Sequence, residues 1–211
     1  MTREATGASP ASRAGLMMES WGEGRPVTVA APALGSPYAV MVLEKLIALE
    51  ARMVLALGWC GSLTPQVRVG HLVLPDGAVS TEGTSPHYLG GSPNPGPDMA
   101  LLNMLKERLP PTGLPWRRGP IWTTDAYYRE TVGQVQHFQQ QGILAVEMEM
   151  AALFAVARFR GISLAGLLVV SDELFELSWR PGRGAGLIRQ AREGAARLLL
   201  ETAAAWRDSR D

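Results

Sequence analysis

Residues 145–153, AVEMEMAAL, place two carboxylates, Glu147 and Glu149, inside an apolar stretch. Burying a carboxylate costs on the order of several kcal/mol unless it is paired or hydrogen-bonded. Either neighbouring structure or a ligand rich in hydroxyl groups, such as a sugar, must therefore satisfy these two side chains. If Glu147 ends a strand and Glu149 opens a helix, one carboxylate can face a pocket while the other supports it. The alternative is that both are solvated or capping residues in the first turn of a helix.

Three further groups of polar or small residues follow apolar runs. Gly58-Trp59 follows VLAL, Thr123 to Asp125 follow GPIW, and Ser171-Asp172 follow a long apolar run that ends in LLVV. Ligands in α/β proteins bind at the carboxyl ends of strands, so we expect all four groups to converge on one pocket. Residues 58–62, GWCGS, are expected to form a turn whose N–H groups approach a ligand, with a plain tight turn as the alternative.

The elements that must position these groups alternate along the chain. Apolar runs predict strands at residues 26–31, 54–57, 69–79, 119–124, 144–146 and 162–170. Helical periodicity and breakers predict helices at residues 37–51, 98–109, 131–140, 149–160 and 185–206. Residues 82–88 and the GGSPNPGPD stretch from Gly90 are expected to be loop. This alternation predicts a single α/β domain with helices on both faces of a mixed central sheet, spanning residues 15–211 after a disordered tail at residues 1–14.

The composition narrows the class of protein. The chain has 211 residues, of which 46% are hydrophobic and 19% charged, as in folded globular domains. A net charge of zero argues against a nucleic-acid partner, and no apolar run reaches the roughly 20 residues that span a bilayer. The single cysteine, Cys60, suits the cytoplasm, and the three histidines lack the spacing of metal ligands. We therefore expect a cytoplasmic protein without a metal.

Six segments in order carry a family resemblance. Together they resemble the nucleoside phosphorylase and uridine phosphorylase family, whose relatives include the methylthioadenosine/S-adenosylhomocysteine nucleosidases. The segments are LGSPYAVMVLEKL, LGWCGSL with VRVGHLVLP, EGTSPHY, TTDAYYRET, VEMEMAALFAVA and LLVVSDEL. The resemblance covers roughly residues 25–183 and implies a three-layer α/β/α fold like that of the nucleoside phosphorylases.

The resemblance also implies roles at the sugar and the base. Glu149 would bind the ribose 2′- and 3′-hydroxyls, Met148 would pack under the sugar, and Glu147 would shape the same wall. A buried carboxylate accepts two hydroxyl hydrogen bonds well, and its charge favours an oxocarbenium-like transition state. Tyr127 would stack near base and sugar, and Thr123 would lie at the base. The alternative for Tyr127 is an ordinary core tyrosine.

Asp172 matches the aspartate of the purine-cleaving family members. There it would protonate, or hydrogen-bond to, N7 of the leaving base, with Ser171 orienting it. A purine leaves poorly as an anion, so a general acid at N7 typically raises the rate by about 10²–10⁴-fold. The alternative is a helix N-cap, since Ser or Asp between a strand and a helix commonly caps the helix. Ser171-Asp172 favours a purine nucleoside over uridine as the substrate.

The chain departs from the family at the phosphate site. Nothing in residues 1–27 matches the family's GDPxR loop, Ala56 replaces an arginine, and Trp59 replaces a serine or threonine. Alanine and tryptophan do not supply the charge and hydroxyl groups that hold a dianion. Gly58 and Trp59 remain the candidates for a phosphate loop. His71 also stands where the family usually has aspartate.

Three hypotheses follow. The first is a phosphorylase that takes inorganic phosphate as co-substrate and needs no other cofactor; Arg129, Arg180, Arg183 or a neighbouring subunit's arginine would hold the phosphate. The second is a hydrolytic nucleosidase, for which Glu19 and Glu23 are the nearby carboxylates. The third is a nucleoside-binding homologue without turnover. In each case the resemblance implies a homo-oligomer, a hexamer or a dimer.

Overall fold

The computed structural model describes residues 16–20, 26–30, 32–90, 94–182 and 185–206. The expected disordered tail, residues 1–14, lies outside these ranges, as do Glu23 and Arg183 among the residues named above. Of β1 (Leu16–Ser20) the backbone is described but not the side chains. None of the helices in these ranges is both long and apolar enough to cross a bilayer.

The central sheet is mixed and curls until it closes on itself. It contains β3 (Met53–Ser62), β4 (Leu72–Ser80), β5 (Trp116–Thr123), β6 (Ala145–Glu147), β7 (Ser163–Glu173) and β8 (Arg180–Pro181). The strand order is β3-β6-β5-β4-β7-β8, and β3 pairs again with β7, which joins the first five strands into a ring. β7 is parallel to β3 but antiparallel to β4. β1 and β2 (Pro26–Ala30) form a separate antiparallel pair.

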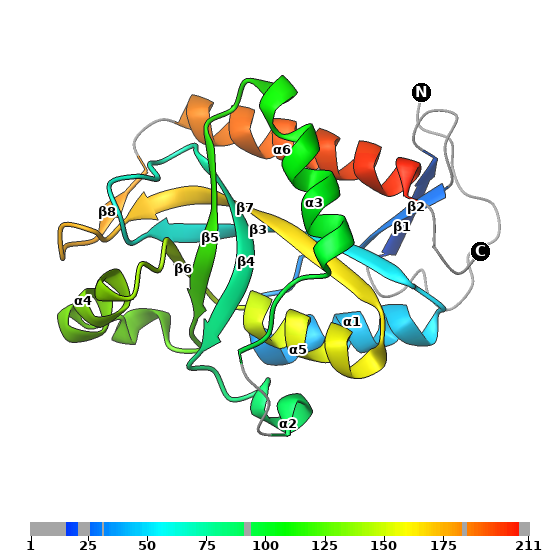
Figure 1. Ribbon diagram of the computed structural model, residues 1–211, viewed down its shortest axis with the longest axis horizontal. Helices are drawn as coiled ribbons and strands as arrows, with labels where there is room; N and C mark the ends of the chain where they lie inside the picture. Colours follow the sequence, from blue (N-terminus) through cyan, green and yellow to red (C-terminus); the bar gives the residue numbers. More distant parts are fainter. Residues whose placement is uncertain (1–15, 21–25, 31, 91–93, 183–184, 207–211) are drawn as a thin grey trace.

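Helices cover both sides of this sheet (Figure 1). On one side lie α1 (Ser36–Ala48) and α5 (Met150–Arg160), which share a core with residues such as Val54, Ala56 and Leu168. On the other side α3 (Met99–Arg108) and α6 (Ala185–Ala205) pack on Leu72, Leu167 and Val169. Around α4 (Val132–Gln140), a third cluster contains Trp122 stacked on Phe138 at 4.4 Å. Short helical turns are α2 (Pro86–Leu89), η2 (Pro110–Thr112) and η3 (Tyr127–Arg129).

The predicted α/β class, the mixed sheet and the long helices are confirmed, but three local predictions are wrong. Residues 58–62 form no turn: Gly58 and Trp59 continue β3 and pair with Leu168 and Val169 of β7. Because β7 supplies backbone partners along the whole of β3, β3 continues through Gly58 to Ser62. β7 likewise continues past Val170 through Glu173, and the expected loop at residues 82–88 contains the start of α2.

One glycine permits the tight seam between β3, β7 and α5. A Cβ atom on Gly166 would lie 2.8 Å from the Ala56 carbonyl oxygen and 2.9 Å from the Met150 methyl group. The absent side chain lets the backbones of β7 and β3 approach beneath α5. This seam brings the ends of β3, β6 and β7 together.

Candidate active site

Glu147 is a buried support at the end of β6, with only 5% of its surface exposed. Its Oε2 accepts hydrogen bonds from the backbone N–H groups of Glu149 at 2.7 Å and Met150 at 2.8 Å, and its Oε1 accepts one from the Thr123 hydroxyl. Thr123, fully buried, in turn accepts from the Ala151 N–H at 3.0 Å. These bonds fix the start of α5. Burial outweighs them and raises the pKa of Glu147 to about 7.

Glu149 is the half-buried residue immediately before α5. Its Oε1 accepts a hydrogen bond from the Gly35 N–H at 2.6 Å, and the Ser36 hydroxyl donates to the Met148 carbonyl at 2.8 Å. Burial raises the pKa of Glu149, and the N–H groups of Gly35 and Met148 oppose that rise. Glu147 is therefore satisfied within the protein, whereas Glu149 stays partly exposed.

Gly35 has a backbone conformation that its residue type permits. Its φ of 83° lies in the region that side chains disfavour, and Gly35 directly precedes α1. This conformation brings the Gly35 N–H to the Glu149 carboxylate, across 114 positions of sequence. The sequence predicted a helix from residue 37 but not this contact.

The three strand ends meet at Gly61. Gly61 pairs with Val146 of β6 on one side and with Asp172 of β7 on the other. A Cβ atom on Gly61 would lie 2.9 Å from Asp172 Oδ2 and 2.5 Å from a Leu174 methyl group. Burial raises the pKa of the neighbouring Cys60 thiol, and the charges of Asp172 and Glu147 raise it further. The carboxylates of Asp172 and Glu147 thus lie around one point of the sheet.

Asp172 is half-buried and bonded through both carboxylate oxygens. Oδ1 accepts a hydrogen bond from the Ser171 hydroxyl at 2.6 Å, and Oδ2 accepts one from the Trp179 indole N–H at 3.1 Å. The residue sits inside β7, where it also pairs with Pro181 of β8. It therefore caps no helix, because the next described helix begins at Ala185. Ser171 lies where the sequence predicted an orienting group.

Tyr127 faces the same carboxylate from η3. Its side chain is 39% exposed and contacts Tyr128 edge to face at 5.1 Å, so it is not an ordinary core tyrosine. Burial raises the pKa of Tyr127, followed in effect by the charges of Asp172 and Glu130. Glu130 itself is half-buried, and burial with the Asp172 charge raises its pKa to about 7. Glu130 and Trp179 were missed at the sequence level because no motif marks them.

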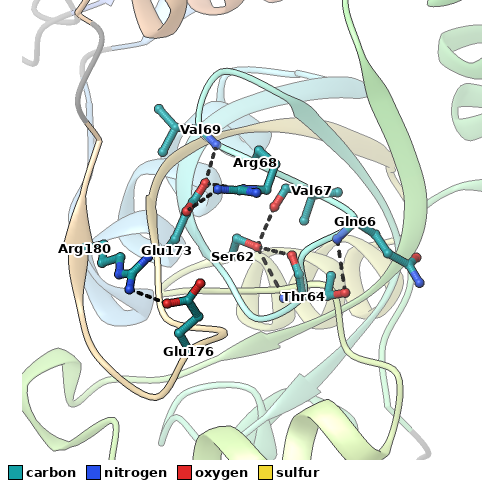
Figure 2. Close-up of polar contacts among 9 residues, drawn as sticks. All are labelled: Ser62, Thr64, Gln66, Val67, Arg68, Val69, Glu173, Glu176 and Arg180. Atoms are coloured by element: carbon teal, nitrogen blue, oxygen red, sulfur yellow. Dashed lines mark hydrogen bonds and ion pairs between the residues drawn. The ribbon is translucent and has the colours of Figure 1, made fainter.

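An ion-pair network surrounds Glu173, the residue after Asp172 (Figure 2). Arg68 donates two hydrogen bonds to Glu173, at 2.8 and 3.2 Å, and the Val69 N–H donates a third at 3.1 Å. Arg180, one of the arginines suggested for phosphate, pairs with Glu176 four residues earlier. A cavity of about 620 Å³ opens beside this network, lined by Arg68, Trp179 and Arg180 among others.

Gly58 and Trp59, the candidates for a phosphate loop, are not among the residues that form ion pairs with arginines in the described ranges. Gly58 is flanked by Leu168, whose methyl group would lie 3.0 Å from an added Cβ, and Trp59 is 47% exposed. In the described ranges, the arginine ion pairs run to Glu44, Asp76, Glu173 and Glu176, not to the site carboxylates. Within the same ranges, no cluster of three potential metal ligands occurs.

A closed mixed sheet between two helical layers, with carboxylates gathered at its strand ends, defines the chain as an α/β protein. A sequence model described as the Phosphorylase superfamily matches residues 4–203. The chain belongs to this superfamily.

Relatives and solved structures agree with this assignment. The chain is 31% identical over 152 residues to a guanosine phosphorylase from Halorubrum lacusprofundi and 30% identical over 153 residues to a DeoD-type purine nucleoside phosphorylase from Myxococcus xanthus. Each match covers 72% of this chain, but only 63% and 64% of the relatives' length. A uridine phosphorylase structure from Vibrio fischeri matches with a TM-score of 0.77 and 25% identity, over 90% of this chain and 77% of that one.

Proposed function

We propose that this chain binds a purine nucleoside and cleaves its N-glycosidic bond by phosphorolysis, which yields the free base and ribose 1-phosphate. The observation that carries this proposal is the placement of a half-buried Glu149, held by the Gly35 N–H, just after β6, and of Asp172 on β7, two strands that both pair with Gly61 of β3. The two relatives named above, whose names specify guanosine and purine nucleosides, support the choice of substrate class.

Glu149 is suited to the ribose. One of its oxygens accepts from Gly35 at 2.6 Å, which fixes the carboxylate while its partly exposed surface is left for two sugar hydroxyls. As the bond between C1′ and the base nitrogen breaks, positive charge develops on the sugar, and a nearby carboxylate stabilises that charge. Glu147 and Thr123 act as the rigid support that holds the Glu149 backbone, because both are bonded to the start of α5.

Asp172 is suited to the base. The bonding electrons pass to the purine as it leaves, and a proton delivered to N7 by the Asp172 carboxyl neutralises the developing anion. The Ser171 hydroxyl orients Oδ1, and the exposed Trp179 indole occupies Oδ2 in the free protein. An incoming base would take the place of that indole bond. Tyr127, on η3, would stack on the base from the exposed side.

The nucleophile has a second candidate, water. Ala56 packs into the core and Trp59 stands beside the strand end, where the resemblance calls for an arginine and a hydroxyl. If no arginine reaches the site, hydrolysis replaces phosphorolysis, and C1′ takes an oxygen from water instead of phosphate. A chain that catalyses neither phosphorolysis nor hydrolysis would be a nucleoside-binding protein.

The decisive experiment is incubation of the purified chain with guanosine, inosine, adenosine, methylthioadenosine and uridine, with and without phosphate. Phosphate-dependent release of a purine base supports the proposal. Release at the same rate without phosphate supports the hydrolytic alternative, and binding without release supports the third hypothesis.

Glu149→Ala tests the sugar site. The variant removes the carboxylate that would accept two charge-assisted hydrogen bonds, so we expect riboside affinity to fall by about 100-fold, or roughly 3 kcal/mol. Isothermal titration with guanosine measures the loss. Glu44→Ala is the matched control, because Glu44 is also half-buried but is paired with Arg160. Unchanged affinity in Glu149→Ala would remove the sugar-site assignment.

Asp172→Asn tests the base site. The amide keeps the shape of the side chain but delivers no proton to N7, so purine release should slow by about 10²–10⁴-fold while nucleoside affinity changes little. Uridine, which lacks N7, serves as the internal control in single-turnover assays. Equal slowing of purine and uracil release would reject the general-acid role.

We also propose a homo-oligomer. Tyr38 and Met41, three residues apart in α1, are 50% and 68% exposed, and Leu34, just before the helix, is 78% exposed. Apolar side chains arranged along one helix face are typical of surfaces buried between subunits. Light scattering at micromolar concentration measures the assembly, and a monomer would reject it.

A further inference from the structure

Glu130 is a half-buried glutamate held between η3 and α4. Its backbone N–H donates to the Tyr127 carbonyl at 3.5 Å, and the next residue, Thr131, is the N-cap of α4 and forms a capping box there. The two residues before it, Tyr128 and Arg129, are both exposed, Tyr128 by 95%. Among these three neighbours, Glu130 is therefore the one whose side chain the protein partly covers.

This partly covered side chain lies beside Asp172 of β7. Burial and then the Asp172 charge raise the pKa of Glu130 to about 7. Tyr127 borders both groups, because its pKa is raised by burial, then by the Asp172 charge and then by the Glu130 charge. The two carboxyl groups, one from the junction of η3 and α4 and one from β7, therefore line the same space as the tyrosine.

No described arginine neutralises this pair of carboxyl groups through an ion pair. The arginine ion pairs in the described ranges go to Glu44, Asp76, Glu173 and Glu176. Arg129 is exposed, and the one titratable side chain of α4, His137, is exposed and bonded to Gln141. Two like charges at close range disfavour the doubly ionised state, so one carboxyl group of such a pair keeps its proton to higher pH.

A retained proton is what the proposed base site requires. An isolated aspartic acid, with a usual pKa of about 3.9, is ionised at neutral pH and has no proton to give. A second carboxyl group changes this, because the protons of a coupled pair belong to the pair and leave in two separate steps. N7 of a purine is a lone-pair acceptor, so it bonds well to the form of the pair that still carries one proton.

We propose that Glu130 is the proton-sharing partner of Asp172: at neutral pH the two carboxyl groups hold one proton between them, and this proton bonds to N7 of a purine nucleoside. The inference rests on the proposed function, which places the base at Asp172. As the bond from C1′ to the base nitrogen breaks, its electrons pass to the purine, the shared proton moves to N7, and a phosphate oxygen bonds to C1′. Both carboxylates are then ionised, and the pair regains one proton from water. Glu130 acts through Asp172, so it is a positioning residue.

The first test needs no substrate. Carbon-13 NMR of labelled glutamate side chains follows their titration in the full chain, and Glu130→Gln and Glu147→Gln assign the two groups whose pKa is about 7. We expect Asp172→Asn to lower the pH at which Glu130 titrates by roughly half a unit or more, because burial remains but the neighbouring charge is removed. An unchanged Glu130 titration in Asp172→Asn would overturn the pair.

The second test measures the pH dependence of guanosine binding by calorimetry without phosphate. Above about pH 7 the pair must take up a proton to bond to N7, so affinity should fall by about tenfold per pH unit. The matched ligand is 7-deazaguanosine, which carries a C–H group in place of N7 and should show no such fall. A guanosine affinity that does not change with pH would show that the proton is not used at the base.

Variants separate proton sharing from a merely structural role. In Glu130→Gln the fall should begin at lower pH, so guanosine binding at pH 7 should weaken by about tenfold while binding of 7-deazaguanosine stays unchanged. Glu130→Asp keeps a carboxyl group and should retain the pH dependence. Glu107→Gln is the control, because Glu107 is an exposed glutamate on α3, and it should behave as the unmodified chain does.

The outcomes distinguish this inference from the proposed function. Equal weakening of guanosine and 7-deazaguanosine in Glu130→Gln at every pH would reduce Glu130 to a structural residue. A chain that binds no purine nucleoside at any pH would reject the proposed function and, with it, delivery of the proton to N7. The carbon-13 titration of the free chain would still decide whether Glu130 and Asp172 share a proton.

Discussion

At the scale of single residues, two glutamates two positions apart have different physical roles. Glu147 is 5% exposed and satisfied by Thr123, Glu149 and Met150, whereas Glu149 is half-buried and held by Gly35. The difference follows from where β6 ends and α5 begins, which turns one side chain inward and leaves the other beside solvent. A single shared role for the pair is therefore excluded.

Glu147 makes stability depend on pH. Its folded-state pKa of about 7 is above its usual value of 4.5, so the folded protein binds a proton more tightly than the unfolded chain. The stabilisation is complete below about pH 4.5 and is lost as the pH rises through about 7. The shift corresponds to on the order of 3 kcal/mol.

Glu147→Gln isolates this effect, because the amide does not ionise. We expect urea denaturation to show that the unmodified chain loses stability between pH 5 and pH 8 relative to Glu147→Gln, by about 1–3 kcal/mol. Glu176→Gln, on an exposed and solvated glutamate, should not change the pH dependence in this range. Parallel pH profiles for the unmodified chain and Glu147→Gln would show that burial does not raise the Glu147 pKa.

At the scale of secondary-structure elements, the start of α5 has no capping side chain of its own. Glu149 occupies the cap position without a capping bond. The backbone N–H groups of Met150 and Ala151 at the helix start donate instead to the side chains of Glu147, on β6, and Thr123, on β5. The helix that presents Glu149 is therefore fixed to the sheet rather than to its own first turn.

Thr123→Val tests this attachment. Valine has nearly the same shape but leaves the Ala151 N–H without an acceptor and Glu147 without its hydroxyl donor, so unfolding free energy should fall by about 1–3 kcal/mol. Thr202→Val is the control, because the buried Thr202 hydroxyl only donates to the Leu198 carbonyl within its own helix. If Thr123→Val and Thr202→Val lost the same unfolding free energy in chemical denaturation, the attachment of α5 to the sheet would contribute no more than an ordinary buried hydroxyl hydrogen bond.

At the scale of the whole molecule, the ring of strands depends on close contact between β3, β7 and α5. Gly166→Ala inserts a methyl group 2.8 Å from the Ala56 carbonyl oxygen, which the backbone must move to accommodate. We expect a loss of roughly 1–3 kcal/mol in unfolding free energy, measured by guanidinium denaturation.

Gly133→Ala provides the contrast for that variant. Gly133 lies in α4 with no heavy atom within 4 Å of an added Cβ, so alanine should be neutral or stabilising there. If Gly166→Ala and Gly133→Ala had the same unfolding free energy, the contact between β3, β7 and α5 would accommodate a methyl group and would not constrain the strand ends.

The sequence alone determined the elements and the identity of the polar groups. Apolar runs and breakers locate β2, β5, β6 and the long helices because local hydrophobic patterns fix local structure. The groups at Thr123, Glu149 and Asp172 predicted one shared site because strand ends of a common sheet meet at one edge. The boundaries of β3 and β7 were wrong, since Gly58 and Ser171 look like breaks until the facing strand is known.

Only the tertiary structure decided how these parts combine. It showed that the sheet closes through β3 and β7, that Gly35 holds Glu149, and that Glu130 and Trp179 lie near Asp172. These features arise from contacts between residues far apart in the chain, such as the 114 positions between Gly35 and Glu149, and local sequence patterns carry no information about which distant segments meet.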